Sequence, residues 1–158
     1  MTTKVVIALG SNLGDRQAAL DFAVARLAPL VSNLTLSSVV ETEPAGEGLQ
    51  DQPLYLNAVA VGHTALTARE MLDALLAIEK ACGRERPYPG APRTLDLDLI
   101  LLGATIRNST GLQVPHPRFR ERTFVLGPLV EIAPDMIDPV TGLTVAQLLR
   151  KLLQDESR

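Results

Sequence analysis

The 158-residue sequence contains no tryptophan, two histidines and only one cysteine, Cys82. A single cysteine excludes an internal disulfide and is typical of proteins in a reducing cytoplasm. No stretch resembles a transmembrane span of about 20 apolar residues or the apolar segment of a secretory signal. We therefore expect a cytoplasmic protein that does not associate with membranes.

An excess of charge of one sign is also missing, because 15 basic and 18 acidic residues give a net charge of −3. This balance offers no argument for nucleic-acid binding. The arginines are nevertheless concentrated in the middle of the chain and just after it, at Arg84, Arg86, Arg93, Arg107, Arg118, Arg120 and Arg122. Such a local excess in an acidic protein suggests a smaller polyanionic ligand, such as a nucleoside triphosphate.

The most informative stretch runs from Arg93 to Leu102, where two carboxylates precede a continuous apolar run of strand length. Residues two apart in a strand point the same way, so Asp96 and Asp98 share one face. Two anions beside a core repel each other unless a cation lies between them. Mg²⁺ suits such a pair of carboxylates, because it commonly binds one or two protein carboxylates and fills its other coordination positions with water and substrate phosphates. The alternative is that both aspartates end a strand in solvent.

The spacing of apolar residues predicts a single α+β domain over residues 1–158. The expected strands are 5–9, 33–41, 54–61 and the run carrying Asp96 and Asp98, and the expected helices are 16–30, 67–82, 124–133 and 145–153. A turn and a return strand are expected at 103–107. The order of the first elements matches the ferredoxin-like βαββαβ plan, an antiparallel sheet with helices on one face. The long loops 42–53 and 84–93 are then expected to serve an active site.

Several single residues stand out within these elements. Asn57 is an amide among apolar strand residues, so it either bonds the adjacent loop backbone or binds a flat heterocycle beside Tyr55. Glu79 lies in the last turn of its helix, where the helix dipole disfavours an anion, and we expect a cationic partner. His116 lies between two prolines and is better placed to contact phosphate than His63, which we expect in a surface turn.

Five motifs occur in the order found in one enzyme family. They are Gly10-Ser11-Asn12-Leu13-Gly14, Asp51-Gln52-Pro53-x-Tyr55-x-Asn57, Gly83-Arg84, Pro92-Arg93-Thr94-Leu95-Asp96-Leu97-Asp98 and Val114-Pro115-His116-Pro117. From Val5 to about Pro134 the sequence resembles the 6-hydroxymethyl-7,8-dihydropterin pyrophosphokinases of folate biosynthesis. These enzymes move the β,γ-pyrophosphoryl group of ATP to the pterin's hydroxymethyl oxygen and leave AMP.

The resemblance implies a role for each matching residue. Asp96 and Asp98 would hold two Mg²⁺ ions, with Arg84 and Arg93 as the catalytic arginines on the triphosphate. The residues implied to bind the pterin are Thr42, Ala45, Tyr55, Asn57 and Phe124. Those implied to bind the nucleotide, besides the two arginines, are Glu79, Leu99, His116 and Arg122.

The sequence departs from the family at the lid, where a tryptophan that closes over the pterin has no counterpart and Tyr88 is the candidate substitute. Two other functions remain open. A two-metal phosphoesterase would also use the two aspartates but would need more ligands. A ferredoxin-like binding or regulatory module would have no turnover. We expect a monomer whose partners are ATP and the pterin.

Overall fold

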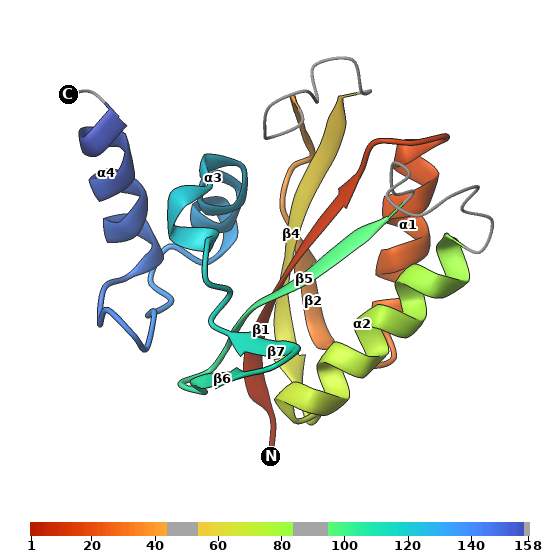
Figure 1. Ribbon diagram of the computed structural model, residues 1–158, viewed down its shortest axis with the longest axis horizontal. Coiled ribbons are helices and arrows are strands. Elements are labelled where there is room, and N and C mark those ends of the chain that lie inside the picture. The colour runs from red at the N-terminus through yellow and green to blue at the C-terminus, as the bar shows by residue number, and fades with distance from the viewer. Residues whose placement is uncertain (44–53, 84–94, 157–158) are drawn as a thin grey trace.

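The computed structural model describes residues 1–43, 54–83 and 95–156 (Figure 1). Its elements are β1 (Thr3–Ser11), α1 (Arg16–Leu27), β2 (Ser32–Leu36), β3 (Val40–Thr42), β4 (Tyr55–Thr64), α2 (Ala68–Cys82), β5 (Asp96–Leu102), β6 (Arg107–Ser109), β7 (Leu112–Val114), η1 (Phe119–Glu121), α3 (Thr123–Ile132) and α4 (Val145–Glu156). The main sheet has the order β2-β4-β1-β5, with β3 beside β4, and all its pairs are antiparallel. This order confirms the predicted ferredoxin-like α+β fold.

The sheet is covered on both faces, as Figure 1 shows. Val5, Ile7 and Leu9 of β1 point toward α1 and α2, whereas Val6 points toward α3 and α4. The two helices of the βαββαβ plan, α1 and α2, therefore share one face as expected, while α3 and α4 cover the face that the plan leaves open. Helix α3 is almost entirely apolar, so its packing against the face of the sheet that α1 and α2 do not cover removes apolar surface of both from water.

Two predicted boundaries were wrong. The first helix ends at Leu27 rather than at residue 30, because Pro29 has no N–H to continue the helical hydrogen bonds. The predicted strand 33–41 is split into β2 and β3. The hydroxyl of Ser37 accepts the Val59 N–H at 2.9 Å, and Ser38 donates twice to Glu131. The Ser37 N–H still donates to the Val59 carbonyl oxygen at 2.9 Å, and the side-chain bonds supplement this one backbone contact in the interruption.

Strand β4 continues through residues 62–64, where we expected a surface turn. His63 pairs with Lys4 of β1 and with Ser32 of β2, so it lies within the sheet. Gly62 permits this close packing. A Cβ atom there would lie 2.4 Å from Cγ1 of Val31 and 2.7 Å from the carbonyl oxygen of Ser32.

Helix α2 begins as predicted. The Thr67 hydroxyl accepts the Glu70 N–H at 3.1 Å, and the Glu70 carboxylate accepts the Thr67 N–H at 2.9 Å. After β5 the chain turns at Gly103, but the return strand does not pair with β5 as expected; β6 pairs with β7 instead. Thus β5 lies at the edge of the described sheet. No described helix combines the length and apolar character needed to cross a membrane.

Candidate active site

A pocket of about 290 Å³ lies at one end of the sheet. The C-terminal end of β1 meets the N-terminal ends of β4 and β5 there, with α3 on one side. The described residues that line it are Ala8, Leu9, Gly10, Thr42, Glu43, Tyr55, Asn57, Ala58, Glu79, Asp96, Asp98, Arg122, Phe124 and Val125. The fold therefore brings together most of the described residues to which the resemblance gave a role.

The two aspartates lie on the pocket face of β5, while Leu97 and Leu99 are buried on the opposite face. The predicted alternation is confirmed. The Tyr55 hydroxyl donates to Oδ2 of Asp96 at 3.4 Å, and a terminal guanidinium nitrogen of Arg122 lies 4.0 Å from Oδ2 of Asp98. Two carboxylates on one wall make this part of the pocket a strong attractor of cations.

The donor set fits a cation that arrives with other ligands. No group of three or more His, Cys, Asp or Glu side chains in the described ranges could hold a metal ion. Asp96 and Asp98 together supply two carboxylates, the number that Mg²⁺ commonly takes from a protein when phosphates and water fill its remaining positions. A self-sufficient metal centre would need more protein ligands.

Other residues that line the same pocket suit a flat polar ring. Phe124 and Tyr55 supply aromatic surface, and Asn57, which is only 8% exposed, lies between β3 and β1. Its Nδ2 donates to Oγ1 of Thr42 at 2.6 Å, so its partner is a side chain and not loop backbone. A Cβ atom on Gly10 would lie 3.1 Å from Oδ1 of Asn57, so glycine leaves the space beside that oxygen open.

A second pocket of about 220 Å³ lies among α2, β5 and β7. Leu99 and His116 line it, whereas Glu79 and Arg122 line the first pocket. Asp98 borders both. The predicted nucleotide residues are thus divided between two adjacent pockets that meet at one carboxylate.

Glu79 joins α2 to the start of β5. Its carboxylate accepts the backbone N–H of Leu97 at 2.7 Å, which places an amide dipole against the anion. The expected cationic partner of Glu79 stays a prediction. Ala45, Arg84, Tyr88 and Arg93 lie outside the described residues, and their implied roles also stay predictions.

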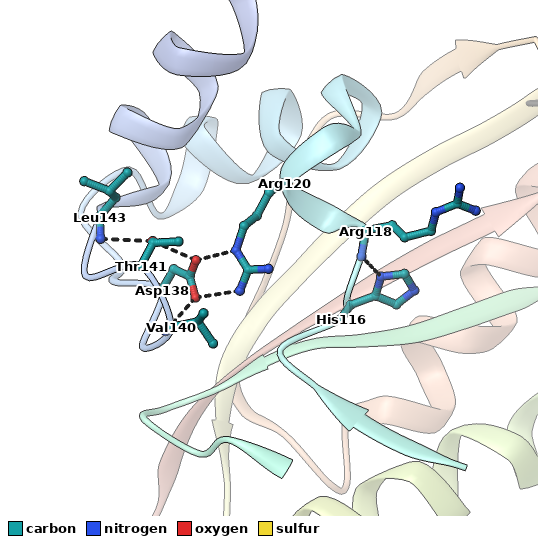
Figure 2. A network of polar contacts seen from close by, with 7 residues as sticks. All are labelled: His116, Arg118, Arg120, Asp138, Val140, Thr141 and Leu143. Atoms are coloured by element: carbon teal, nitrogen blue, oxygen red, sulfur yellow. Dashed lines mark hydrogen bonds and ion pairs between the residues drawn. The ribbon is translucent and has the colours of Figure 1, made fainter. Parts of the chain in front are cut away.

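His116 is docked on the edge of β5. Its backbone N–H donates to the carbonyl oxygen of Ile100 at 3.0 Å, and its Nδ1 accepts the Arg118 N–H at 3.1 Å (Figure 2). The neutral ring therefore carries its proton on Nε2. Burial lowers the pKa of His116 below 6.5; Asp98 opposes this shift, and Arg122 and Arg118 add to it.

We predict that His116 titrates below 6.5. Because the unfolded chain takes up this proton more readily, the free energy of unfolding should fall as the pH drops from 6.5 toward the folded pKa. NMR titration of the ring signals measures the pKa directly, with His63 as an internal comparison. A His116 pKa at or above 6.5 would contradict the prediction.

The surroundings of one arginine and one glycine were not evident from the sequence. Arg120 is not available to phosphate, because its guanidinium is bound by the buried carboxylate of Asp138. Gly10 lines the pocket, although only its motif drew attention. Its register opposite Asn57 on one side and Asp96 on the other would have indicated its place.

The comparisons with known proteins agree with this geometry. Residues 6–134 match the family described as 7,8-dihydro-6-hydroxymethylpterin-pyrophosphokinase. A 2-amino-4-hydroxy-6-hydroxymethyldihydropteridine pyrophosphokinase of Pseudomonas aeruginosa is 43% identical over 86% of this chain and 84% of its own length. A folic acid synthesis protein of Pneumocystis carinii is 39% identical over 96% of this chain, which spans only 20% of that protein.

A solved structure supports the fold independently. The wild-type HPPK-DHPS of Plasmodium falciparum superposes with a TM-score of 0.77 at 13% identity, over 99% of this chain and 46% of that one. At this identity the likeness speaks for the fold alone. The family match extends over most of the sequence and includes every described residue that lines the two pockets. The chain belongs to the 7,8-dihydro-6-hydroxymethylpterin-pyrophosphokinase family.

Proposed function

We propose that this chain transfers the β,γ-pyrophosphoryl group of ATP to the hydroxymethyl oxygen of 6-hydroxymethyl-7,8-dihydropterin, in folate biosynthesis. The new bond joins that oxygen to the β-phosphorus, the bond from the β-phosphorus to the α,β-bridging oxygen breaks, and AMP leaves. One observation carries the proposal: a pocket suited to a flat ring and a second pocket share Asp98. A transferred group would lie where the two meet.

The pterin occupies the first pocket. Tyr55 and Phe124 provide aromatic surface for its two faces, and Asn57 bonds its edge. The Thr42 hydroxyl holds the Asn57 amide, and the resemblance also implies that the Thr42 backbone completes the pterin pocket. Ala45, three residues further along the sequence, contributes backbone contacts, as the family resemblance implies.

The nucleotide lies along the edge of β5. Leu99 packs against the base, His116 and Arg122 face the phosphates, and Glu79 borders the same region. Arg84 and Arg93 contact the triphosphate. At the pH of the cell the neutral His116 ring donates from Nε2, so the positive charge on this side comes from the arginines.

Asp96 and Asp98 would hold two Mg²⁺ ions together with the phosphates of ATP. Bound there, Mg²⁺ would neutralise phosphate charge and orient the triphosphate. The protein's own contribution is alignment of the two substrates and exclusion of water, since transfer of this kind needs little covalent help from side chains.

We further propose that residues 1–158 act as one domain and as a monomer in the cytoplasm. Helices of the same chain cover both faces of the sheet, so its core needs no second subunit. The single cysteine suits a reducing compartment.

Phosphorus NMR of the purified protein with MgATP and the pterin tests the reaction. We expect AMP and a pterin diphosphate to form together, and no AMP without the pterin. Release of inorganic phosphate without acceptor would favour a phosphoesterase. Nucleotide binding without any product would favour a binding module.

A further inference from the structure

Among the described residues, Asp138 is the only charged side chain that is fully buried. It lies between α3 and α4 and lines neither pocket. Its carboxylate accepts Nε and a terminal nitrogen of Arg120 at 2.5 and 3.0 Å, the Val140 N–H at 3.0 Å and the Thr141 hydroxyl at 2.8 Å (Figure 2). A buried carboxylate persists only when it is bonded as completely as this.

These contacts keep Asp138 ionised. Burial raises the pKa of its carboxyl, but the hydrogen bonds from Arg120, Val140 and Thr141 outweigh burial and bring the pKa below its ordinary value. Its backbone is fixed as well, because its N–H donates to the Leu143 carbonyl oxygen at 2.9 Å. Asp138 therefore offers Arg120 a rigid anionic anchor.

Arg120 belongs to η1, the short helix between two residues of the candidate nucleotide site. The Arg118 N–H bonds the ring of His116 on one side, and the Arg122 N–H donates to the Phe119 carbonyl oxygen at 3.2 Å on the other. The Phe119 ring is fully buried, and the Arg120 guanidinium stacks on it at 4.7 Å. The turn 116–122 is thus bonded within itself and tied to the α3–α4 segment through Arg120.

We propose that the Arg120–Asp138 pair positions the nucleotide side of the active site, by holding the turn 116–122 so that His116 and Arg122 face the phosphates of ATP. Both members act through other residues and are positioning residues. The identity of the ligand rests on the proposed function; the placement of the turn does not.

A purely stabilising role is a weaker explanation of this pair. Buried ion pairs often add little net stability compared with apolar side chains of similar size, because both charges lose their hydration. Transfer of a highly charged group, in contrast, depends on groups placed to within about an ångström. A fixed, two-point contact with a planar guanidinium meets that need.

The test is a double variant, Arg120→Met with Asp138→Leu. It removes both charges together, so that neither charge is left in the interior without its partner. We expect KM for MgATP, and Kd for a non-hydrolysable MgATP analogue, to rise about tenfold. KM for the pterin at saturating MgATP should stay unchanged. Arg120→Lys keeps the positive charge but loses the two-point contact that the planar guanidinium makes with Asp138. It should therefore raise KM for MgATP and Kd for the analogue by a smaller factor.

A matched control separates positioning from stability. Leu27→Ala removes a fully buried side chain on the other face of the sheet, so it should lower Tm without changing either KM. If the double variant only lowers Tm and keeps both constants, the proposal is overturned. Equal rises in KM for both substrates would also overturn it, because the whole site would then be disturbed.

A second readout needs no substrate and stands even if the transfer reaction is wrongly assigned. The protein has two histidines, so the ring nitrogen shifts of His116 can be followed beside those of His63. Above the ordinary histidine pKa, the wild-type His116 ring should show one tautomer, with Nδ1 as acceptor. The double variant should show a mixture. An unchanged tautomer would mean that the turn does not depend on the pair.

Discussion

Asp98→Asn is expected to lower kcat by at least about 10³-fold, and Asp96→Asn likewise, while the protein keeps its fold. The substitution preserves the shape of each side chain but removes one of the two charges available to Mg²⁺. A metal ion contributes several kcal/mol to a transition state that gains charge, and about 1.4 kcal/mol corresponds to a factor of ten in rate. Formation of AMP in the steady state measures the loss.

Retention of the fold is expected because both aspartates face a pocket and the Asp98 side chain is 45% exposed. Thermal unfolding without Mg²⁺ should show a Tm no lower than that of the wild type, since one of two neighbouring negative charges is gone. Asp73→Asn, on the exposed side of α2, is the matched control and should keep kcat. Wild-type kcat in either active-site variant would refute the metal assignment.

Asn57→Leu is expected to raise KM for the pterin by about 10²-fold, with a much smaller effect on KM for MgATP. Leucine has a similar volume but no amide group. The Thr42 hydroxyl would lose the Asn57 hydrogen bond, and the polar edge of the bound pterin would lose its proposed partner. Losing one partner of a hydrogen bond in a binding site weakens ligand binding strongly, because the other partner stays buried without a hydrogen bond. Steady-state kinetics with each substrate varied in turn measures both constants.

Thr42→Val provides a graded comparison. It keeps Asn57 but removes the oxygen that accepts from Nδ2 at 2.6 Å, so the amide is less firmly oriented and KM for the pterin should rise by an intermediate factor. If Asn57→Leu instead raises KM for MgATP most, the pterin and the nucleotide have been assigned to the wrong pockets.

Local signals explain what the sequence could predict. The aspartates of β5 alternate with apolar neighbours, and the capping box at Thr67 lies within one helical turn, so both are readable without knowledge of the fold. The order of strands and helices then restricts the topology to few choices. These signals associated the strand of Asp96 and Asp98 with the long loops of an active site, whereas the family resemblance added Tyr55 and Asn57 to that site.

Contacts between residues far apart in the chain explain the features that could not be predicted from the sequence. Residues 62–64 have turn-like composition, but pairing with β1 and β2 on both sides holds them in a strand. Arg120 looked like its neighbours Arg118 and Arg122 until the fold brought in Asp138 from 18 residues away. The division of nucleotide residues between two pockets likewise depends on β7, a strand that no local pattern indicated.

The edge of β5 has a consequence for self-association. An exposed edge strand offers unpaired N–H and C=O groups to other chains and is a common starting point for aggregation. Here the Leu97 N–H is bound by the Glu79 carboxylate, and the Ile100 carbonyl oxygen is bound by the His116 N–H. The contacts that place Glu79 and His116 beside the two pockets therefore also occupy backbone groups that another chain would need for edge-to-edge pairing with β5.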